Sequence, residues 1–176
     1  MADETSTLIN SYATGDATAT GTYTAEAGGL AGLCSENSIV KFCYATGTVT
    51  AEINGDYGLQ PRAYAGGLVG TGYSMMGCYA TGHVSVRCTV PNLDCQLAAG
   101  GLTGSDQAKV RNSYRYDGQQ VLTDAGEGQL VTAGTACTFT QLSTAAFYTD
   151  TLVWDSEIWD FSDLDYLSQK NPVLRK

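Results

Sequence analysis

The chain has 176 residues, enough for one domain with a sizeable core, but its composition is not that of an ordinary globular domain. It contains 21 glycines, 11 tyrosines against 4 phenylalanines and only 15% charged residues, a bias that favours strands joined by glycine turns. The net charge of −9 disfavours nucleic acid and anionic membrane surfaces as partners, because both are bound through clustered Lys and Arg.

The N-terminal residues Met1-Ala-Asp-Glu-Thr5 contain neither a basic segment nor an apolar core, so they do not match a signal peptide. No apolar run approaches the roughly 18 residues that a bilayer span requires, and we expect no membrane insertion. If the natural protein is secreted, we expect this chain to be a fragment that lacks its signal peptide.

Two short motifs alternate along the first 116 residues. The first reads Ser or Cys, then Tyr-Ala-Thr-Gly, and its tyrosines recur after 32, 35 and 35 residues, the last in a decayed copy: Tyr12, Tyr44, Tyr79 and Tyr114. The second reads Ala-Gly-Gly-Leu-x-Gly and lies between copies of the first, at 27–32, 65–70 and 99–104. Alternation in a constant order at a nearly constant period indicates a stack of structural repeats.

A repeat of about 35 residues rich in Val, Thr and Tyr cannot bury its own apolar side. Stacked copies can, if each pairs with the next through parallel strands about 4.8 Å apart. An alternation of period two directs Ser, Cys, Ala and Gly inward and Tyr and Thr outward. We expect Leu30, Leu68 and Leu102 to form the main core column, with the paired glycines before them making tight corners at positive φ.

A helical repeat is the structural alternative, and the paired glycines disfavour it because each costs about 1 kcal/mol in a helix. We therefore predict an all-β protein, a right-handed parallel β-solenoid (β-helix) of three to four rungs with a small mixed C-terminal cap. The solenoid is expected at 1–116 and the cap at 117–176. The Trp, Phe and Leu residues of the cap should close the open end of the solenoid, and a short helix is expected over 140–147. The rungs are expected near 8–32, 38–70, 75–104 and 110–116.

The alternating motifs resemble the Glug repeat, named for its Gly-Leu-x-Gly core, which occurs in bacterial and archaeal surface proteins and beside some immunoglobulin A1 proteases. The resemblance covers roughly residues 6–116, and the closing Asn-Pro-Val-Leu at 171–174 looks like the end of such arrays. It implies a stalk-like or adhesive module of an extracellular or cell-surface bacterial protein. Its partners would be host or cell-surface proteins or glycans and the neighbouring domains of a larger protein. The resemblance implies no activity.

The segments between the two motifs vary in length, with 11 residues at 16–26, 17 at 48–64 and 16 at 83–98. Variation at one point of every rung predicts loops on one side of the stack, where solenoids usually recognise ligands. The second segment contains Tyr57, Arg62 and Tyr64. The third contains Cys88 and Cys95, which flank a turn-forming stretch and are candidates for a local disulfide.

The other four cysteines have different settings. Cys43 and Cys78 occupy equivalent positions that hold serine in the other copies, which indicates small core residues. Cys34 and Cys137 have no assigned partner, and either a Cys34–Cys43 bond or a link to the cap remains open. With no C-x(2–4)-C pair and a single histidine, the chain does not predict a metal site or cofactor.

The residue pattern does not predict catalysis. His83 is the single histidine, and no nucleophile motif such as G-x-S-x-G accompanies it. The acidic cluster over 155–165 matches no calcium loop, and we expect it to be a solvated face. A polysaccharide lyase or hydrolase is an alternative by analogy with β-helical enzymes alone.

The tyrosine column is expected to stack about 5 Å apart outside the solenoid. The favoured interpretation is a ladder that stabilises the stacked rungs. The alternative is a glycan-binding surface, because Tyr combines an apolar face with a polar tip. That surface would use the four ladder tyrosines together with Tyr57, Arg62 and Tyr64.

Overall fold

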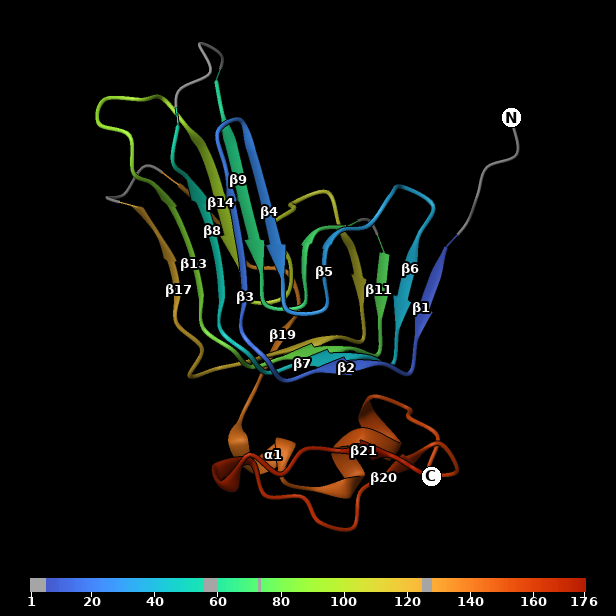
Figure 1. The fold of residues 1–176 in the computed structure, drawn as a ribbon. Coiled ribbons are helices and arrows are strands. Elements are labelled where there is room, and N and C mark those ends of the chain that lie inside the picture. Colours follow the sequence, from blue (N-terminus) through green and yellow to red (C-terminus); the bar gives the residue numbers. More distant parts are fainter. Residues whose placement is uncertain (1–5, 56–59, 73, 125–127) are drawn as a thin grey trace.

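The computed structural model describes residues 6–55, 60–72, 74–124 and 128–176. They form an all-β protein in which parallel sheets stack as a β-solenoid of about three turns (Figure 1). The first rung consists of β1 (Thr7–Ile9), β2 (Tyr12–Ala13), β3 (Ala17–Gly21), β4 (Thr24–Gly28) and β5 (Ala31–Leu33). The second consists of β6 (Ile39–Lys41), β7 (Tyr44–Ala45), β8 (Val49–Ile53), β9 (Arg62–Gly66) and β10 (Val69–Thr71).

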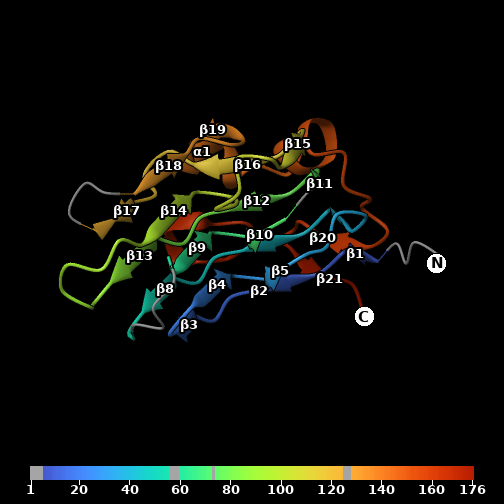
Figure 2. The same cartoon turned by 90° about the horizontal axis from the view of Figure 1, so that it is seen from above.

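Later rungs repeat this order. The third consists of β11 (Ser74–Met76), β12 (Tyr79–Ala80), β13 (Val84–Cys88), β14 (Gln96–Gly100) and a bridge at Thr103. A fourth, incomplete rung consists of β15 (Lys109–Arg111), β16 (Tyr114–Tyr116), β17 (Val121–Thr123) and β18 (Gln129–Val131). After it, β19 (Thr135–Cys137) pairs with β16. Figure 2 shows the rungs side by side from β2 and β3 to β18 and β19. Because β17, β18 and β19 all pair with solenoid strands, the solenoid extends to Cys137 and does not end at residue 116 as predicted.

The sequence motifs coincide with the pairing register. Tyr12 pairs with Tyr44, Tyr44 with Tyr79, and Tyr79 with Tyr114, so the spacing of the motif is the length of one rung. The inward columns fill two interior clusters. One contains Ala and Val of the long strands; the other contains Cys43, Cys78, Ala45, Ala80, Leu68 and Leu102. Leu68 and Leu102 are fully buried, as expected for the core column, whereas Leu30 in the first rung is half-buried.

A corner lies two residues before each ladder tyrosine, and it has left-handed backbone in every rung. The residues there are Asn10, Phe42, Gly77 and Asn112, with φ between 45° and 64°. Asparagine and glycine adopt this region most readily, so three of the four rungs carry a residue suited to the corner. The corner explains why the apolar column Leu8–Val40–Met75–Val110 does not follow the alternation of the tyrosine motif.

The paired glycines have a different role from the predicted one. None of them has positive φ among the described residues. Instead, a Cβ at Gly28 would overlap the carbonyl oxygen of Ala31, and the equivalent Gly66 would overlap that of Val69. Glycine is therefore required because two backbone segments approach closely where the chain folds back, and its access to positive φ is not used.

The remaining residues, 138–176, form a segment that we call the C-terminal flank. It contains α1 (Phe139–Leu142), a π-helical turn (Phe147–Thr151), β20 (Trp159–Asp160), a 3-10 turn (Tyr166–Ser168) and β21 (Val173–Leu174), which pairs antiparallel with β20. The predicted helix over 140–147 is shorter and begins earlier, because Thr138 and Gln141 form a capping box. None of the helices in the described ranges is long and apolar enough to cross a membrane.

Leu68→Asp tests the core column. Leu68 is 0% exposed, so the substitution buries a charge and should lower the free energy of unfolding by more than about 4 kcal/mol. The matched control is Leu33→Asp, since Leu33 is 62% exposed and should change stability by less than about 0.5 kcal/mol. Urea unfolding followed by far-ultraviolet circular dichroism measures both, and equal effects would contradict the assigned core.

Candidate functional site

The ladder tyrosines stack closely on the outside of the solenoid. The rings of Tyr12 and Tyr44 are 5.0 Å apart and inclined by 4°, and those of Tyr44 and Tyr79 are 4.9 Å apart and inclined by 9°. This spacing follows from the separation of parallel strands. Tyr114 continues the register, and Phe147 of the C-terminal flank packs edge-on against its ring at 5.1 Å.

The C-terminal flank covers this ladder. Figure 1 shows it, in orange to red, below the sheet that contains β2 and β7. Trp154 lies 6.2 Å from the ring of Tyr44 and 5.8 Å from that of Tyr79, and Trp159 lies 6.0 Å from Tyr44. The two central ladder rings are consequently 1% and 0% exposed. The aromatic residues predicted to close the open end of the solenoid therefore cover its side, where a row of apolar rings needs burial.

Hydrogen bonds attach the flank to the ladder. The hydroxyl of Tyr44 donates to the carbonyl of Pro172 at 2.8 Å, and that of Tyr79 donates to Asn171 Oδ1 at 3.2 Å. Trp154 Nε1 donates to the carbonyl of the corner residue Gly77 at 2.6 Å. Burial raises the pKa of both tyrosines, so both hydroxyls keep their protons and act as donors.

Three of the four ladder tyrosines are packed against the flank, as the interpretation of the ladder as a stabilising element requires. Tyr44 and Tyr79 are buried, and Tyr114 is half-buried against Phe147. Only Tyr12, on the first strand of the sheet, has an exposed ring, at 40%. A glycan-binding stripe that uses all four tyrosines is incompatible with this arrangement.

The acidic cluster of the flank satisfies local backbone groups. Asp155 accepts from the backbone N–H of Glu157 at 2.8 Å, and Asp165 accepts from Leu167 at 3.1 Å. Asp160 accepts from the backbone of Ser162 at 2.9 Å, and this bond lowers the pKa of its carboxyl group. Asp163 pairs with Lys170 at 2.9 Å. Across the described ranges no three His, Cys, Asp or Glu side chains gather where they could hold a metal ion.

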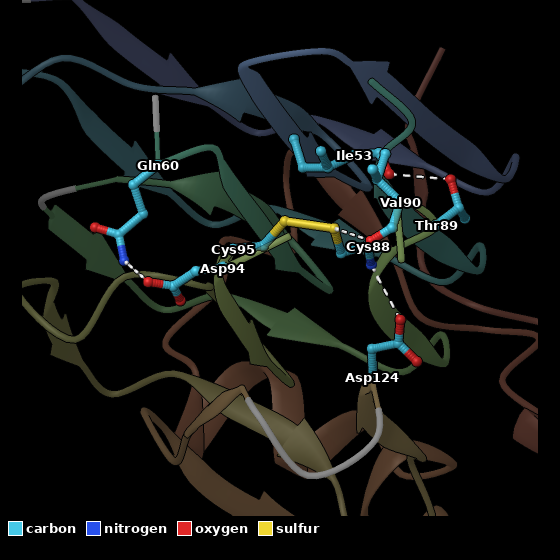
Figure 3. The surroundings of a disulfide bond; sticks show 8 residues. All are labelled: Ile53, Gln60, Cys88, Thr89, Val90, Asp94, Cys95 and Asp124. Carbon is cyan, nitrogen blue, oxygen red and sulfur yellow. Dashed lines mark hydrogen bonds between the residues drawn. A yellow bond between two sulfur atoms is a disulfide. The ribbon is translucent and has the colours of Figure 1, made fainter. Parts of the chain in front are cut away.

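The corner loops form a second candidate surface. The strands β3, β8, β13 and β17, after which these loops begin, end along one edge of the solenoid, away from the C-terminal flank (Figure 1). A disulfide joins Cys88 and Cys95 across the third loop, with a Cα–Cα distance of 6.6 Å, and this is the pairing indicated by the sequence (Figure 3). The bond fixes the two ends of the third loop where it leaves the solenoid.

Neighbouring loops are linked from rung to rung. Thr89 donates from Oγ1 to the carbonyl of Ile53 in the second rung at 3.1 Å, and Gln60 donates to Asp94 at 2.9 Å (Figure 3). On the other side, the backbone N–H of Cys88 donates to Asp124 of the fourth rung at 3.1 Å. A hollow of about 630 Å³ lies between Asp124 and the loop residues 90–95. Sequence reasoning missed Gln60, Asp94 and Asp124, which belong to loops that do not repeat.

The remaining predicted binding residues lie apart from the ladder. Arg62 is exposed and Tyr64 half-buried on β9, across the solenoid from β7 (Figure 1). Tyr57 lies outside the described residues. Thus the structure separates Arg62 and Tyr64, on β9, from the ladder tyrosines beside the flank.

The remaining cysteines and His83, which were considered for disulfides or catalysis, have structural roles. Cys34, Cys43, Cys78 and Cys137 are free thiols, so neither the Cys34–Cys43 bond nor a disulfide to Cys137 of the predicted cap forms. Burial raises the pKa of Cys78, and it raises that of Cys137 to about 12, which keeps both thiols protonated and poorly nucleophilic. His83 is exposed, and its Nδ1 accepts from the backbone N–H of Gln120 at 2.9 Å.

Tyr79→Ala tests whether the ladder holds the flank. Removing this buried ring should lower the free energy of unfolding by about 3–5 kcal/mol. Because both tryptophans of the chain lie in the flank, their fluorescence should shift to the red when it detaches. Tyr64→Ala on β9 is the matched control and should cost less than about 1 kcal/mol. Unchanged tryptophan emission in Tyr79→Ala would contradict the docking contact.

Thiol labelling tests the cysteine assignment. Alkylation of the denatured, unreduced protein should modify Cys34, Cys43, Cys78 and Cys137 and leave Cys88 and Cys95 joined, as read by peptide mass spectrometry. In the native protein only the half-buried Cys34 should react within minutes, because the other three thiols are buried. Rapid native labelling of Cys78 would contradict its place in the core.

Comparisons with known proteins add no assignment. No family model matches the chain, and neither the curated proteins nor the solved structures provide a match. The likeness to the Glug repeat consequently rests on the two alternating motifs. Any functional assignment must come from the solenoid, its corner loops and the surface beside the flank.

Proposed function

We propose that this chain is a non-catalytic structural and adhesive module of an extracellular or cell-surface bacterial protein, built from Glug-type repeats, which presents its corner loops to a partner. The observation that carries the proposal is that β3, β8 and β13, which are followed by segments of unequal length in the sequence, end along one edge of a regular solenoid. Regular rungs supply a rigid support, while the loops vary without disturbing the core. The partners would be proteins or glycans of a host or cell surface.

Two features of the third loop support presentation to a partner. The Cys88–Cys95 disulfide and the bonds to Ile53 and Asp124 hold its ends to three rungs. A pre-ordered loop loses less conformational entropy on binding, which favours affinity. A disulfide also persists best in an oxidising compartment, which supports the extracellular assignment.

Lyase or hydrolase activity has little support. The acids of the flank accept backbone hydrogen bonds or pair with lysine, and His83 accepts from Gln120. Asp160 and Asp163 line one hollow beside the flank, but Asp160 accepts from the backbone of Ser162 and Asp163 is paired with Lys170 at 2.9 Å, so neither carboxylate is available as a general acid or base. Purified chain incubated with polysaccharides should therefore release no reducing sugar, and measurable release would contradict the non-catalytic assignment.

A bead-adhesion assay tests loop presentation. Beads coated with the chain should be retained on mucin, fibronectin, collagen or cultured epithelial cells. Retention should fall at least about tenfold when Pro91, Asn92 and Leu93 are all replaced by serine, a loss that corresponds to about 1.4 kcal/mol. These residues form the tip of the third loop and lie inside the disulfide.

The matched control replaces Leu33, Glu36 and Asn37 by serine. These exposed residues lie at the end of β5 and in the turn before β6, away from the third loop. Retention of the control should equal that of the unmodified chain, and circular dichroism should show both triple variants folded. Equal retention of the loop variant and the unmodified chain would reject the corner loops as the adhesive surface.

A further inference from the structure

A groove lies where the C-terminal flank meets the solenoid. One hollow of about 410 Å³ is lined by Tyr12, Thr14, Asp160, Gln169, Lys170 and Asn171, among others. A second of about 450 Å³ is lined by Thr14, Asp16, Thr48, His83, Tyr166 and Gln169, among others. The two hollows share Thr14, Gln169 and Asn171, so they adjoin. We call them together the seam groove.

An aromatic platform stands at one end of the seam groove. Tyr12 stacks one face of its ring on Tyr44, and its strand β2 is the first of its sheet. Among the described residues no further ladder ring covers the other face, and the side chain is 40% exposed. Tyr44 and Trp159 hold the ring in place, at 5.0 and 6.1 Å. A fixed, exposed aromatic face favours contact with a flat apolar surface of a ligand.

The polar lining supplies donors and acceptors together. Gln169 is exposed, while Asn171 is oriented by Tyr79, which donates to its Oδ1, and by its own bond to the carbonyl of Gln169 at 3.1 Å. The column of Thr14, Thr46 and Thr81 adds hydroxyl groups along the second hollow. Amides and hydroxyls of this kind match ligand hydroxyl groups, which both donate and accept.

The carboxylates of the groove are already engaged. Asp163 pairs with Lys170 at 2.9 Å, Asp160 accepts from the backbone of Ser162, and Asp16 accepts from the backbone N–H of Thr48 at 2.8 Å. Two of these carboxylates have cationic partners already, since Asp160 also lies 4.0 Å from Arg175, and Asp16 alone offers its charge to a cationic peptide. An anionic glycan would approach a chain with a net charge of −9. The lining therefore favours an uncharged, hydroxyl-rich ligand.

We propose that the seam groove binds a neutral oligosaccharide, with one sugar ring stacked on the exposed face of Tyr12 and its neighbours hydrogen-bonded to Thr14, Gln169 and Asn171. The combined shape, an aromatic platform that continues into an amide- and hydroxyl-lined channel, suits a chain of sugars better than a single one. This site is distinct from the corner loops, at the other side of the solenoid.

Titration with neutral hexasaccharides tests the site. Cellohexaose, maltohexaose, mannohexaose and chitohexaose serve as probes, with hexagalacturonate and hexalysine as charged competitors. Trp159 lies beside Tyr12, so binding should change tryptophan fluorescence. At least one neutral probe should saturate the signal below about 10 mM, and calorimetry should give the same Kd. No saturation by any neutral probe, or tighter binding of either charged probe, would overturn the proposal.

Three variants locate the binding. Tyr12→Ala should weaken the best neutral probe about tenfold, and Tyr12→Phe, which retains the ring, should stay within about twofold. Gln169→Gly should weaken it severalfold, since glycine accepts the φ of 56° found at this position. Tyr64→Ala is the matched control and should bind as the unmodified chain does. Equal affinity of Tyr12→Ala and the unmodified chain would place the saccharide elsewhere and refute the site.

The adhesion assay and this titration test different sites, so either proposal can be rejected while the other stands. The triple serine variant of the third loop leaves the lining of the seam groove unchanged, so it should bind the saccharide normally. Conversely, Tyr12→Ala should leave retention through the corner loops intact. Loss of saccharide binding in the loop variant would overturn the seam groove as the binding site.

Discussion

In-register parallel pairing between rungs is the constraint on which the rest of this structure depends. Because each rung pairs with the next over equivalent residues, one residue type in the repeat becomes a column through the molecule. Small residues stack inward, where the rung is narrow, and Leu68 and Leu102 fill the wider part. Glycine is needed wherever successive segments fold back on a neighbouring carbonyl, as at Gly28 and Gly66. The same register that builds the core also places tyrosine over tyrosine outside it.

The tyrosine ladder outside the solenoid is a second apolar surface that must be buried. A row of stacked rings is a large apolar strip, and the C-terminal flank covers its centre with Trp154 and Trp159. The hydroxyls of Tyr44 and Tyr79 then find partners in the flank and are not left unsatisfied. The flank is thus an integral part of the fold. Its edge also creates the seam groove, because the first ring of the ladder extends beyond the cover.

The two surfaces proposed to bind partners differ in how they arise. The corner loops are free of the repeat, since a rung can lengthen at its corner without changing the pairing of its strands, and the disulfide together with the bonds to adjacent rungs orders the third of them. The seam groove is instead a by-product of the regular ladder meeting an irregular flank. Loop sequence can therefore change independently of the core, whereas Tyr12 is tied to the ladder register.

The sequence by itself determined the features that repeat: the strands, the rung length, the inward columns and the stacked tyrosines, because periodic small and apolar residues bury themselves only by stacking. It also located the Cys88–Cys95 bond, since both cysteines flank one short turn. Only the tertiary structure decided where the non-repeating residues lie. The contact of Tyr44 with Pro172 spans 128 residues, and no local pattern encodes it. The paired glycines and the last solenoid strands were likewise misjudged, because their requirements come from neighbouring rungs and not from adjacent residues.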